Sequence, residues 1–330
     1  MASDKINILV IDDLHPCFFE QAGMQDFEIT YLPSINPSDV PLALVNTHVL
    51  IVRGKVIVDK ELCQNANVLQ LIARAGSGVD NLDTDWLETQ GISYINTPEA
   101  NSQAVAEHTL GMLLGLMANI TKADKEVRDF EWDREGNRGD ELEGKTMGII
   151  GFGNTGSRFA KVLGGFGVQI LAYDKYISGF GGGKVKETEM NEIFEKADIV
   201  SLHIPLTAET NNLVNTGFIN LFSKPFRLLN LSRGGIVNTR DVLNALETKK
   251  IIGFGADVLQ NERLNKLNNL ELAEFEKLRS LSNVILTPHI GGWTHQSYKK
   301  ISECLATKIK EFYSHSSHLE KGFKEAQKFP

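Results

Sequence analysis

The sequence predicts an α/β protein built on doubly wound parallel sheets, and three observations support this. Short, continuous apolar runs recur along the chain, and strands buried on both faces of a parallel sheet have this character. Stretches of helical length separate the runs, which is the rhythm of repeated β-α-β units. The chain has 330 residues, more than a single core usually serves, so we expect two domains.

The first series of strands begins near the N-terminus. Acidic residues, Asp4, Asp12 and Asp13, surround the first apolar run, so we interpret it as a buried strand and not as a signal peptide. The expected strands are residues 6–11, 49–52, 69–73 and 93–96, and the expected helices include 59–66 and 84–90.

A long helix is expected over residues 98–120, where Pro98 precedes the apolar stripe and Asn101 or Ser102 can cap the first turn. Two interpretations of this helix stay open, simple core packing and a subunit or domain interface. The charged stretch 121–145 is interpreted as an exposed connector, with Trp132 as an anchored aromatic.

A second β-α-β series follows, and its rhythm is that of a doubly wound sheet. The last expected helix covers about 297–313, before a polar tail. The expected strands are residues 146–150, 169–173, 199–203, 227–231, 252–256 and 284–287.

Composition excludes several functional classes. The formal net charge of −8 argues against a general nucleic-acid partner, because phosphate backbones require a basic surface. Three widely spaced cysteines, Cys17, Cys63 and Cys304, argue against a disulfide framework, a zinc site or another metal site. No apolar run approaches the roughly 18 residues of a membrane span. We therefore expect a soluble, cytoplasmic protein with no membrane partner.

A G-x-G-x-x-G pattern at Gly151, Gly153 and Gly156 follows the expected strand 146–150 and opens a helix. Alone, such a pattern often marks an ordinary turn, but here the strand and helix are in register. Gly151 permits the tight turn, Gly153 leaves room for a pyrophosphate, and Gly156 allows the helix to pack on the strand. The N-terminus of that helix favours phosphate groups, so we expect a dinucleotide site.

The acidic residue expected about 20 positions further on in such a site is Asp174, at the end of strand 169–173. A carboxylate there accepts hydrogen bonds from the ribose hydroxyls and repels a 2′-phosphate. We therefore expect NAD as cofactor in preference to NADP. Lys175, the next residue in the sequence, weakens this expectation slightly because it is positively charged.

Three further residues stand at expected strand ends in the same half of the chain. Arg233 can hold a carboxylate in two hydrogen bonds and polarise a neighbouring carbonyl group. His289, between Pro288 and a glycine pair, suits proton transfer near neutral pH, and a carboxylate such as that of Glu262 would orient it and raise its pKa. Each alone is more often structural, but the ordered set predicts a hydride-transfer site.

These motifs together resemble the D-2-hydroxyacid dehydrogenase family over essentially the whole chain. The resemblance rests on GFGNTG, LSRGGIVN, the spacing of Asp257 and Glu262, and TPHIGG. It implies two Rossmann- or flavodoxin-like domains, with the cofactor domain inserted in the substrate domain. The implied boundaries are 1–98 and 289–330 for the substrate domain and 99–288 for the NAD-binding domain. It also implies a homodimer, with the 98–120 helix in the contact.

The resemblance also implies residue roles. The catalytic residues are Arg233, Glu262 and His289, and Asp257 matches an acidic residue near the nicotinamide carboxamide. One departure is the text after Glu262, which is longer than in the family and lacks proline. The implied cofactor contacts are Gly151, Gly153, Asn154, Thr155, Gly156, Asp174, His203, Pro205, Thr210, Ser232, Asp257, His289 and Gly291.

Within the family, the segment around Arg74 resembles the substrate loop of phosphoglycerate dehydrogenases. Its glycines can present backbone N–H groups to an anion, and Arg53 and Arg74 can supply charge for a phosphate. Lys55, Arg134 and Arg138 are weaker candidates for this charge. The implied substrate contacts are Arg53, Arg74, Gly76, Ser77, Gly78, Val79, Asn101, Arg233 and His289.

The expected function is NAD-dependent oxidation of D-3-phosphoglycerate, a small phosphorylated hydroxy acid, at the start of serine biosynthesis. We expect no C-terminal regulatory domain, because only a short stretch follows Trp293. One alternative is a glyoxylate or hydroxypyruvate reductase, which needs no phosphate pocket. An alternative of another class is a non-enzymatic, NAD-sensing protein of corepressor type. Turnover separates the enzymes from the binding protein.

Overall fold

The computed structural model describes residues 5–316 of the chain, and the chain divides into two compact units. The first unit combines Met1–Asn101 with His295–Pro330, and the second is Ser102–Thr294. The boundaries expected at 98/99 and 288/289 fall a few residues before these. Each unit contains one parallel sheet, so the predicted α/β fold class is confirmed.

The sheet of the first unit has five parallel strands in the order β2-β1-β3-β4-β5. Apolar side chains fill both of its faces, with Val10 and Leu71 in one cluster and Leu9 and Leu50 in the other. This double burial explains the continuous apolar runs. The strands are β1 (Asn7–Val10), β2 (Glu28–Tyr31), β3 (Val49–Val52), β4 (Leu71–Arg74) and β5 (Ser93–Ile95).

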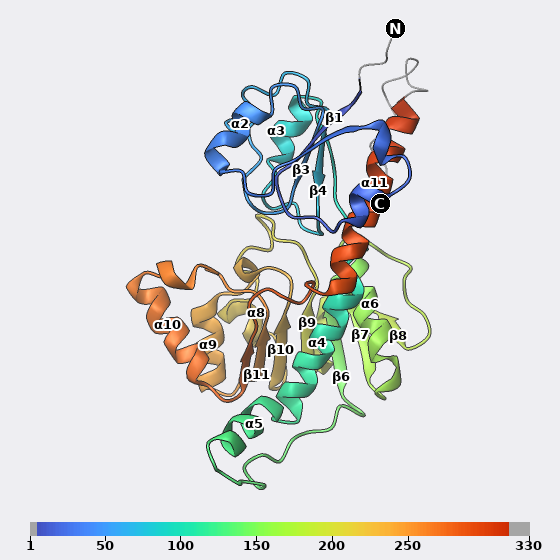
Figure 1. Cartoon of the computed structure of the whole chain (residues 1–330). Coiled ribbons are helices and arrows are strands. Elements are labelled where there is room, and N and C mark those ends of the chain that lie inside the picture. The colour runs from blue at the N-terminus through green and yellow to red at the C-terminus, as the bar shows by residue number, and fades with distance from the viewer. Residues whose placement is uncertain (1–4, 317–330) are drawn as a thin grey trace. The chain divides into compact units, whose positions relative to one another are not determined.

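The last described helix, α11 (His295–Ser316), completes this unit by packing beside the short α1 (Cys17–Glu20), as Figure 1 shows. Ile301, Leu305 and Ile309 of α11 are buried in the same cluster as β1 and β4. The two ends of the described chain therefore share one core. The other helices of the unit are α2 (Val40–Ala43) and α3 (Thr84–Thr89), with short 3₁₀ turns at Met24–Asp26 and Pro37–Asp39.

The sheet of the second unit has seven parallel strands in the order β12-β11-β10-β9-β6-β7-β8. The strand order reverses between β9 and β6, and open α/β sheets bind ligands at such a switch point. The strands are β6 (Thr146–Ile150), β7 (Gln169–Tyr173), β8 (Val185–Glu187), β9 (Ile199–Leu202), β10 (Phe226–Asn230), β11 (Ile251–Ala256) and β12 (Val284–Leu286).

Helices cover both faces of this sheet, and α4 lies against α6 and β11 on one of them (Figure 1). The two faces carry separate apolar clusters, one around Phe159 and Met147 and the other around Phe222 and Leu228. The helices are α4 (Ser102–Met117), α5 (Ile120–Arg128), α6 (Asn154–Val162), α7 (Met190–Lys196), α8 (Thr216–Asn220), α9 (Thr239–Glu247) and α10 (Asn269–Ser280), with 3₁₀ turns at Leu163–Gly165, Gly234–Ile236 and Leu264–Lys266.

The expected helix over 59–66 is wrong, because this stretch forms a series of turns. The Asp59 carboxylate accepts a hydrogen bond from the backbone N–H of Leu62 at 2.9 Å. This is the contact of a helix N-cap, and Cys63 N–H donates to the Asp59 carbonyl at 3.1 Å, but the bonds that follow are of the i→i+3 kind and the turn does not extend into a helix. Two edge strands, β2 and β8, were not expected, because both lack the continuous apolar character of the inner strands.

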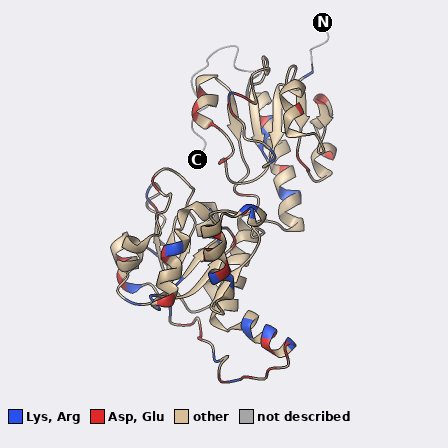
Figure 2. Cartoon of the chain, turned by 90° about the vertical axis from the view of Figure 1, so that its left-hand side faces the viewer, with Lys and Arg blue, Asp and Glu red and all other residues tan. Residues whose placement is uncertain are grey.

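The interpretation of 121–145 as an exposed connector with an anchored aromatic is right in the exposure of residues 129–141 but wrong at the start of the segment and at Trp132. Residues Ile120–Arg128 form helix α5, which is separated from α4 by Asn119 in the left-handed conformation, at φ 54°. Trp132 is 80% exposed, so it anchors nothing within the chain. Figure 2 shows charges of both signs mixed along this segment.

Whether α4 serves core packing or an interface was left open, and its two glycines, Gly111 and Gly115, differ in this respect. A Cβ at Gly115 would lie 3.0 Å from the Ile285 side chain of β12, so Gly115 serves core packing. A Cβ at Gly111 would meet no atom within 4 Å.

Within the described range 5–316, none of the helices combines the length with the apolar character that a membrane crossing requires.

Replacing Phe222 with alanine should destabilise the second unit by about 3–5 kcal/mol, the range for truncating a buried aromatic side chain. Phe222 is 2% exposed and stacks on Phe226 with ring centroids 3.9 Å apart. Urea denaturation followed by circular dichroism measures the change. The neighbouring Leu221→Ala is the control, because Leu221 is 58% exposed; equal losses from both variants would contradict the packing argument.

Candidate active site

The glycine loop after β6 needs glycine at two of its three positions for reasons internal to the chain. Gly151 has φ 92°, and a Cβ there would lie 2.3 Å from the carbonyl oxygen of His203. A Cβ at Gly156 would lie 2.0 Å from the carbonyl oxygen of Gly151. These two glycines therefore set the tight turn and the close approach of α6 to the strand.

Gly153 differs, because a Cβ there would meet no protein atom within 4 Å. It directly precedes α6, whose first residues are Asn154 and Thr155, so open space lies at the positive end of a helix dipole. A dinucleotide pyrophosphate fits both the space and the polarity. The loop thus has the properties of a cofactor site. Within the fold a side chain at Gly153 would have room, so glycine at this position serves the ligand.

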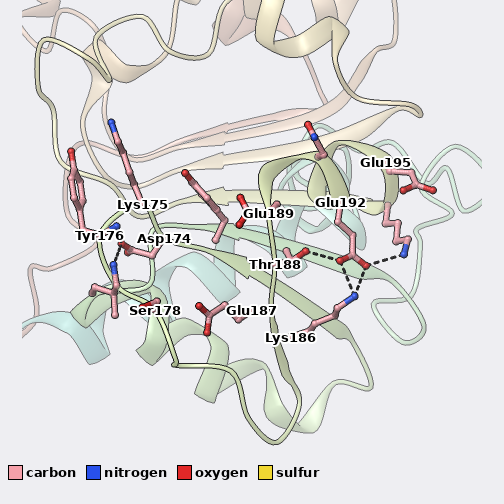
Figure 3. A pocket seen from close by; sticks show the side chains of 14 residues that line it. Asp174, Lys175, Tyr176, Ser178, Lys186, Glu187, Thr188, Glu189, Glu192 and Glu195 are labelled. Atoms are coloured by element: carbon pink, nitrogen blue, oxygen red, sulfur yellow. Dashed lines mark hydrogen bonds and ion pairs between the residues drawn. The ribbon is translucent and has the colours of Figure 1, made fainter.

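Asp174 follows β7 and faces this loop. Its carboxylate accepts hydrogen bonds from the backbone N–H groups of Phe152 at 2.7 Å, Tyr176 at 2.9 Å and Ile177 at 3.0 Å. Beside it lies a groove of about 1020 Å³ bordered by the ends of β7 and β8 and by α7 (Figure 3). The structure therefore places the expected ribose acid between the glycine loop and an open groove.

Four of the expected cofactor contacts, His203, Pro205, Thr210 and Ser232, lie in the loops after β9 and β10. Burial lowers the pKa of His203 to about 4, so this ring is neutral near pH 7, and its Nε2 pairs with the Ser201 hydroxyl at 2.9 Å. The Thr210 hydroxyl donates to the Pro205 carbonyl at 2.7 Å, and the Ser232 hydroxyl donates to the Leu202 carbonyl at 2.6 Å. These bonds hold both loops at the carboxyl edge of the sheet.

Asp257 is a buried carboxylate, 3% exposed, at the end of β11. One oxygen accepts hydrogen bonds from the Thr287 hydroxyl at 2.6 Å and from the backbone N–H of Ile290 at 2.9 Å, and the other accepts from Gly291 N–H at 2.7 Å. Its own carbonyl accepts from His289 N–H at 2.7 Å. Asp257 therefore holds the whole turn that carries His289.

His289 has φ 56°, a left-handed conformation that non-glycine residues rarely adopt. Its Nδ1 lies 3.0 Å from an Oε2 of Glu262, and both side chains are about half exposed. The hydrogen bond from His289 lowers the pKa of Glu262, and the same bond raises the pKa of His289. Because Nδ1 faces Glu262, Nε2 is the ring atom left for a substrate proton.

Arg233 lies at the end of β10 in the same unit, and its guanidinium donates to the Ser232 carbonyl at 2.7 Å. Its positive charge contributes to lowering the pKa values of both Glu262 and His289. The structure thus brings the three expected catalytic residues within electrostatic reach of one another. Their arrangement can bind a carboxylate and exchange a proton.

The proline-free segment after Glu262 still places this carboxylate on His289. The segment forms a 3₁₀ turn and then α10, which begins with a capping box between Asn268 and Glu271. The Glu271 carboxylate also accepts a hydrogen bond from the Asn261 side chain at 3.2 Å. A helix cap therefore orders the loop where the family has proline.

In the first unit, Arg53 and Arg74 lie at the carboxyl ends of the paired strands β3 and β4. The Arg53 guanidinium donates to the Ala75 carbonyl at 3.2 Å. A Cβ at Gly76, φ 145°, would lie 1.9 Å from Nη1 of Arg74, so the guanidinium rests on this glycine. The structure therefore brings both arginines to one edge of the sheet.

The loop that follows is tied together by side chains. Ser77 donates to Asn101 at 2.6 Å, and Asn96 donates to the Ser77 carbonyl at 2.6 Å, so Gly78 and Val79 sit on a braced turn. Lys55 instead donates to the carbonyl groups of Ile11 and Pro33. Arg138 and Arg134 belong to the second unit, and Arg138 pairs with Glu135 at 2.6 Å.

Sequence reasoning missed two supporting residues. His108 of α4 pairs through Nε2 with the Thr287 hydroxyl at 3.0 Å, and that hydroxyl donates to Asp257. Asp12, after β1, accepts a hydrogen bond from the Arg53 backbone N–H at 2.6 Å. The position of Asp12 at the end of an expected strand was the available signal, whereas nothing in the α4 pattern singled out His108.

The comparison with protein families identifies residues 110–291 as a D-isomer specific 2-hydroxyacid dehydrogenase NAD binding domain. The chain belongs to this family. The family resemblance inferred from the motifs is thereby confirmed, and so is NAD as the cofactor.

Relatives in the family carry different names. The chain is 36% identical over 264 residues to D-3-phosphoglycerate dehydrogenase of Synechocystis sp., which covers 79% of this chain and 46% of that protein. It is 33% identical to hydroxypyruvate reductase of Thermotoga maritima, covering 79% of this chain and 83% of that protein. The chain spans about half the length of the phosphoglycerate dehydrogenases that it matches first.

Solved structures agree with the fold. D-lactate dehydrogenase from Aquifex aeolicus, in complex with NAD and lactic acid, superposes with a TM-score of 0.81 at 26% identity. The match covers 94% of this chain and 96% of that one. Similarity to enzymes with different substrates leaves the choice of hydroxy acid to the proposal below.

Gly153→Ala should leave the fold intact and weaken NAD binding by about tenfold or more, because the new methyl group occupies ligand space and touches no protein atom. Thermal unfolding and calorimetric titration with NAD measure the two effects. Gly156→Ala is the matched comparison and should lower the melting temperature, because its Cβ meets backbone. A Gly153 variant that binds NAD normally would place the pyrophosphate elsewhere.

Glu262→Gln should lower the pKa of His289, because the carboxylate that raises it is gone while the opposing charge of Arg233 remains. Titration of the His289 ring signals by NMR measures the change. Glu276→Gln is the control, since Glu276 pairs with Arg279 on α10. An unchanged His289 pKa in the Glu262 variant would show that the pair does not form in solution.

Proposed function

We propose that the protein oxidises D-3-phosphoglycerate to 3-phosphohydroxypyruvate with NAD. The observation that carries this proposal is the pair of arginines, Arg53 and Arg74, at adjacent strand ends beside a glycine loop. Two cations next to a glycine loop suit a doubly charged phosphate better than a methyl or hydroxymethyl group. The names of several relatives support the same substrate.

The chemistry follows from the second unit. Arg233 holds the substrate carboxylate and polarises the oxygen on C2, and Nε2 of His289 removes the hydroxyl proton. Glu262 stabilises the imidazolium that results, through its contact with Nδ1. When bound, NAD accepts the hydride from C2. In the reverse direction His289 must carry its proton before the keto acid is reduced.

The raised pKa of His289 gives the pH dependence a definite sign. Reduction of the keto acid requires the protonated ring, so its rate falls as the pH rises through the pKa of His289. Oxidation of the hydroxy acid requires the neutral ring and gains rate over the same interval. A paired Glu262 moves both changes toward higher pH, so the protonated form remains available near neutrality.

A second candidate is a hydroxypyruvate reductase. One observation favours it, namely that the Thermotoga maritima enzyme of that name matches along 83% of its own length. The catalytic trio serves both reactions equally well. The two functions differ only in whether Arg53 and Arg74 bind a phosphate group.

We also propose that the protein acts as a homodimer in the cytoplasm. The α4–α5 segment supports the dimer, because it exposes large apolar side chains that no described part of the chain covers. Ile120 is 55%, Val127 52% and Phe130 99% exposed. Sedimentation analysis of the full chain tests the oligomeric state.

The deciding experiment compares the consumption of NADH with 3-phosphohydroxypyruvate, hydroxypyruvate, glyoxylate and pyruvate. A strong preference for the phosphorylated keto acid supports the proposal. Preference for hydroxypyruvate or glyoxylate replaces it with the reductase. If the protein binds NAD but reduces none of these keto acids, the result supports a binding protein of the corepressor type.

Arg74→Met should raise KM for 3-phosphohydroxypyruvate by about tenfold to a hundredfold, because the loss of a hydrogen bond between charged groups costs binding free energy of that order. The KM for hydroxypyruvate should change little, because this acid lacks the phosphate. Steady-state kinetics with both acids measure the difference. Arg240→Met, which removes an exposed arginine paired with Glu274 on α10, is the control; equal effects on both acids would remove Arg74 from phosphate recognition.

A further inference from the structure

Three lysines line the groove beside Asp174, and each already binds a carboxylate. Lys186 and Lys196 both donate to Glu192, at 2.7 and 2.8 Å (Figure 3). Lys175, the residue next to Asp174, pairs with Glu209. Among the residues that line this groove, all within the described range, every lysine contacts a carboxylate, and Lys186 and Lys196 share that of Glu192.

The Lys175–Glu209 pair has an unusual position. Lys175 follows β7 and Glu209 lies in the loop after β9, and these two strands flank β6 on opposite sides. The pair therefore joins loops on either side of the strand that ends in the glycine loop. Hydrogen bonds of the neighbouring Thr207 and Thr210 shape the loop that presents Glu209.

This position matters because of the expected role of Asp174. A 2′-phosphate on the adenosine ribose would add negative charge beside Asp174, and an enzyme accepts it only when a cation is available there. Lys175 is the nearest such cation along the chain, and its ammonium lies 5.6 Å from the ring centroid of Tyr176. The Glu209 carboxylate pairs with the Lys175 ammonium and compensates its charge.

We propose that Glu209 is a specificity-determining residue that excludes NADP by holding Lys175. Asp174 repels the 2′-phosphate directly, and Glu209 removes the side chain that could compensate for this repulsion. The inference rests on the cofactor part of the proposed function and is independent of the substrate. It gives the exposed ion pair a role in ligand choice, since exposed pairs add little to stability.

Titration of the purified full chain with NAD and NADP, followed by calorimetry, tests the proposal without turnover. Glu209→Gln should tighten NADP binding by about twofold to fivefold and change NAD binding less than twofold, as expected for one exposed charge pair. The double variant Glu209→Gln with Lys175→Met should lose this gain, because the released cation is absent.

Glu195→Gln is the matched control, because it removes one negative charge from the same groove and leaves Lys175 paired. An equal gain in NADP affinity from this variant would overturn the proposal in favour of a general charge effect. So would an unchanged affinity in Glu209→Gln, or a gain that persists without Lys175. A wild-type protein that binds NAD but oxidises no hydroxy acid would refute the proposed reaction and leave this inference standing.

Discussion

The buried carboxylate of Asp257 positions more of the candidate site than any other group. It accepts three hydrogen bonds from the turn at 287–291, which offsets the cost of burying its charge. Its backbone N–H donates to the Asn230 carbonyl at 3.0 Å, and the Asn230 side chain donates to the carbonyl of Arg233. The ends of three neighbouring strands are thus tied together. The left-handed backbone of His289 is tolerable because this network over-determines it.

In both units the residues expected in the site lie at the carboxyl ends of parallel strands, but the two units place different kinds of residue there. In the first unit, β3 and β4 end in arginines on an otherwise acidic chain, so positive charge is local and directed. In the second unit, the cofactor loop has no side chain at Gly153, and the Glu262–His289 pair follows β11 and β12, beyond β9 and β10 in the sheet. The two arginines and this pair are therefore supported by separate cores.

The sequence predicted the inner strands well, because continuous apolar runs obey a short-range rule, and two of the residues that it named for catalysis, Glu262 and His289, lie in contact. Gly151 and Gly156 indicate a tight turn in the sequence, because a side chain at either position would collide with backbone. The edge strands β2 and β8 escaped notice, since strands with exposed side chains lack a continuous apolar signal. The turns at 59–66 resembled a helix because Asp59 caps a first turn, as in a helix, which the following residues do not extend. His108 could not be found, because its role depends on Thr287, 179 positions away.

The place of α11 has a consequence for how the chain acquires its structure. The core of the first unit includes Ile301, Leu305 and Ile309, which are synthesised after the second unit, together with Phe18 and Ile8, which are synthesised before it. Until α11 is made, one face of the five-stranded sheet stays uncovered, whereas the contiguous second unit has every element that it needs. Synthesis from the N-terminus therefore favours an order in which the inserted unit matures before the unit that encloses it in sequence. During that interval the apolar surface that α11 later covers is prone to aggregation.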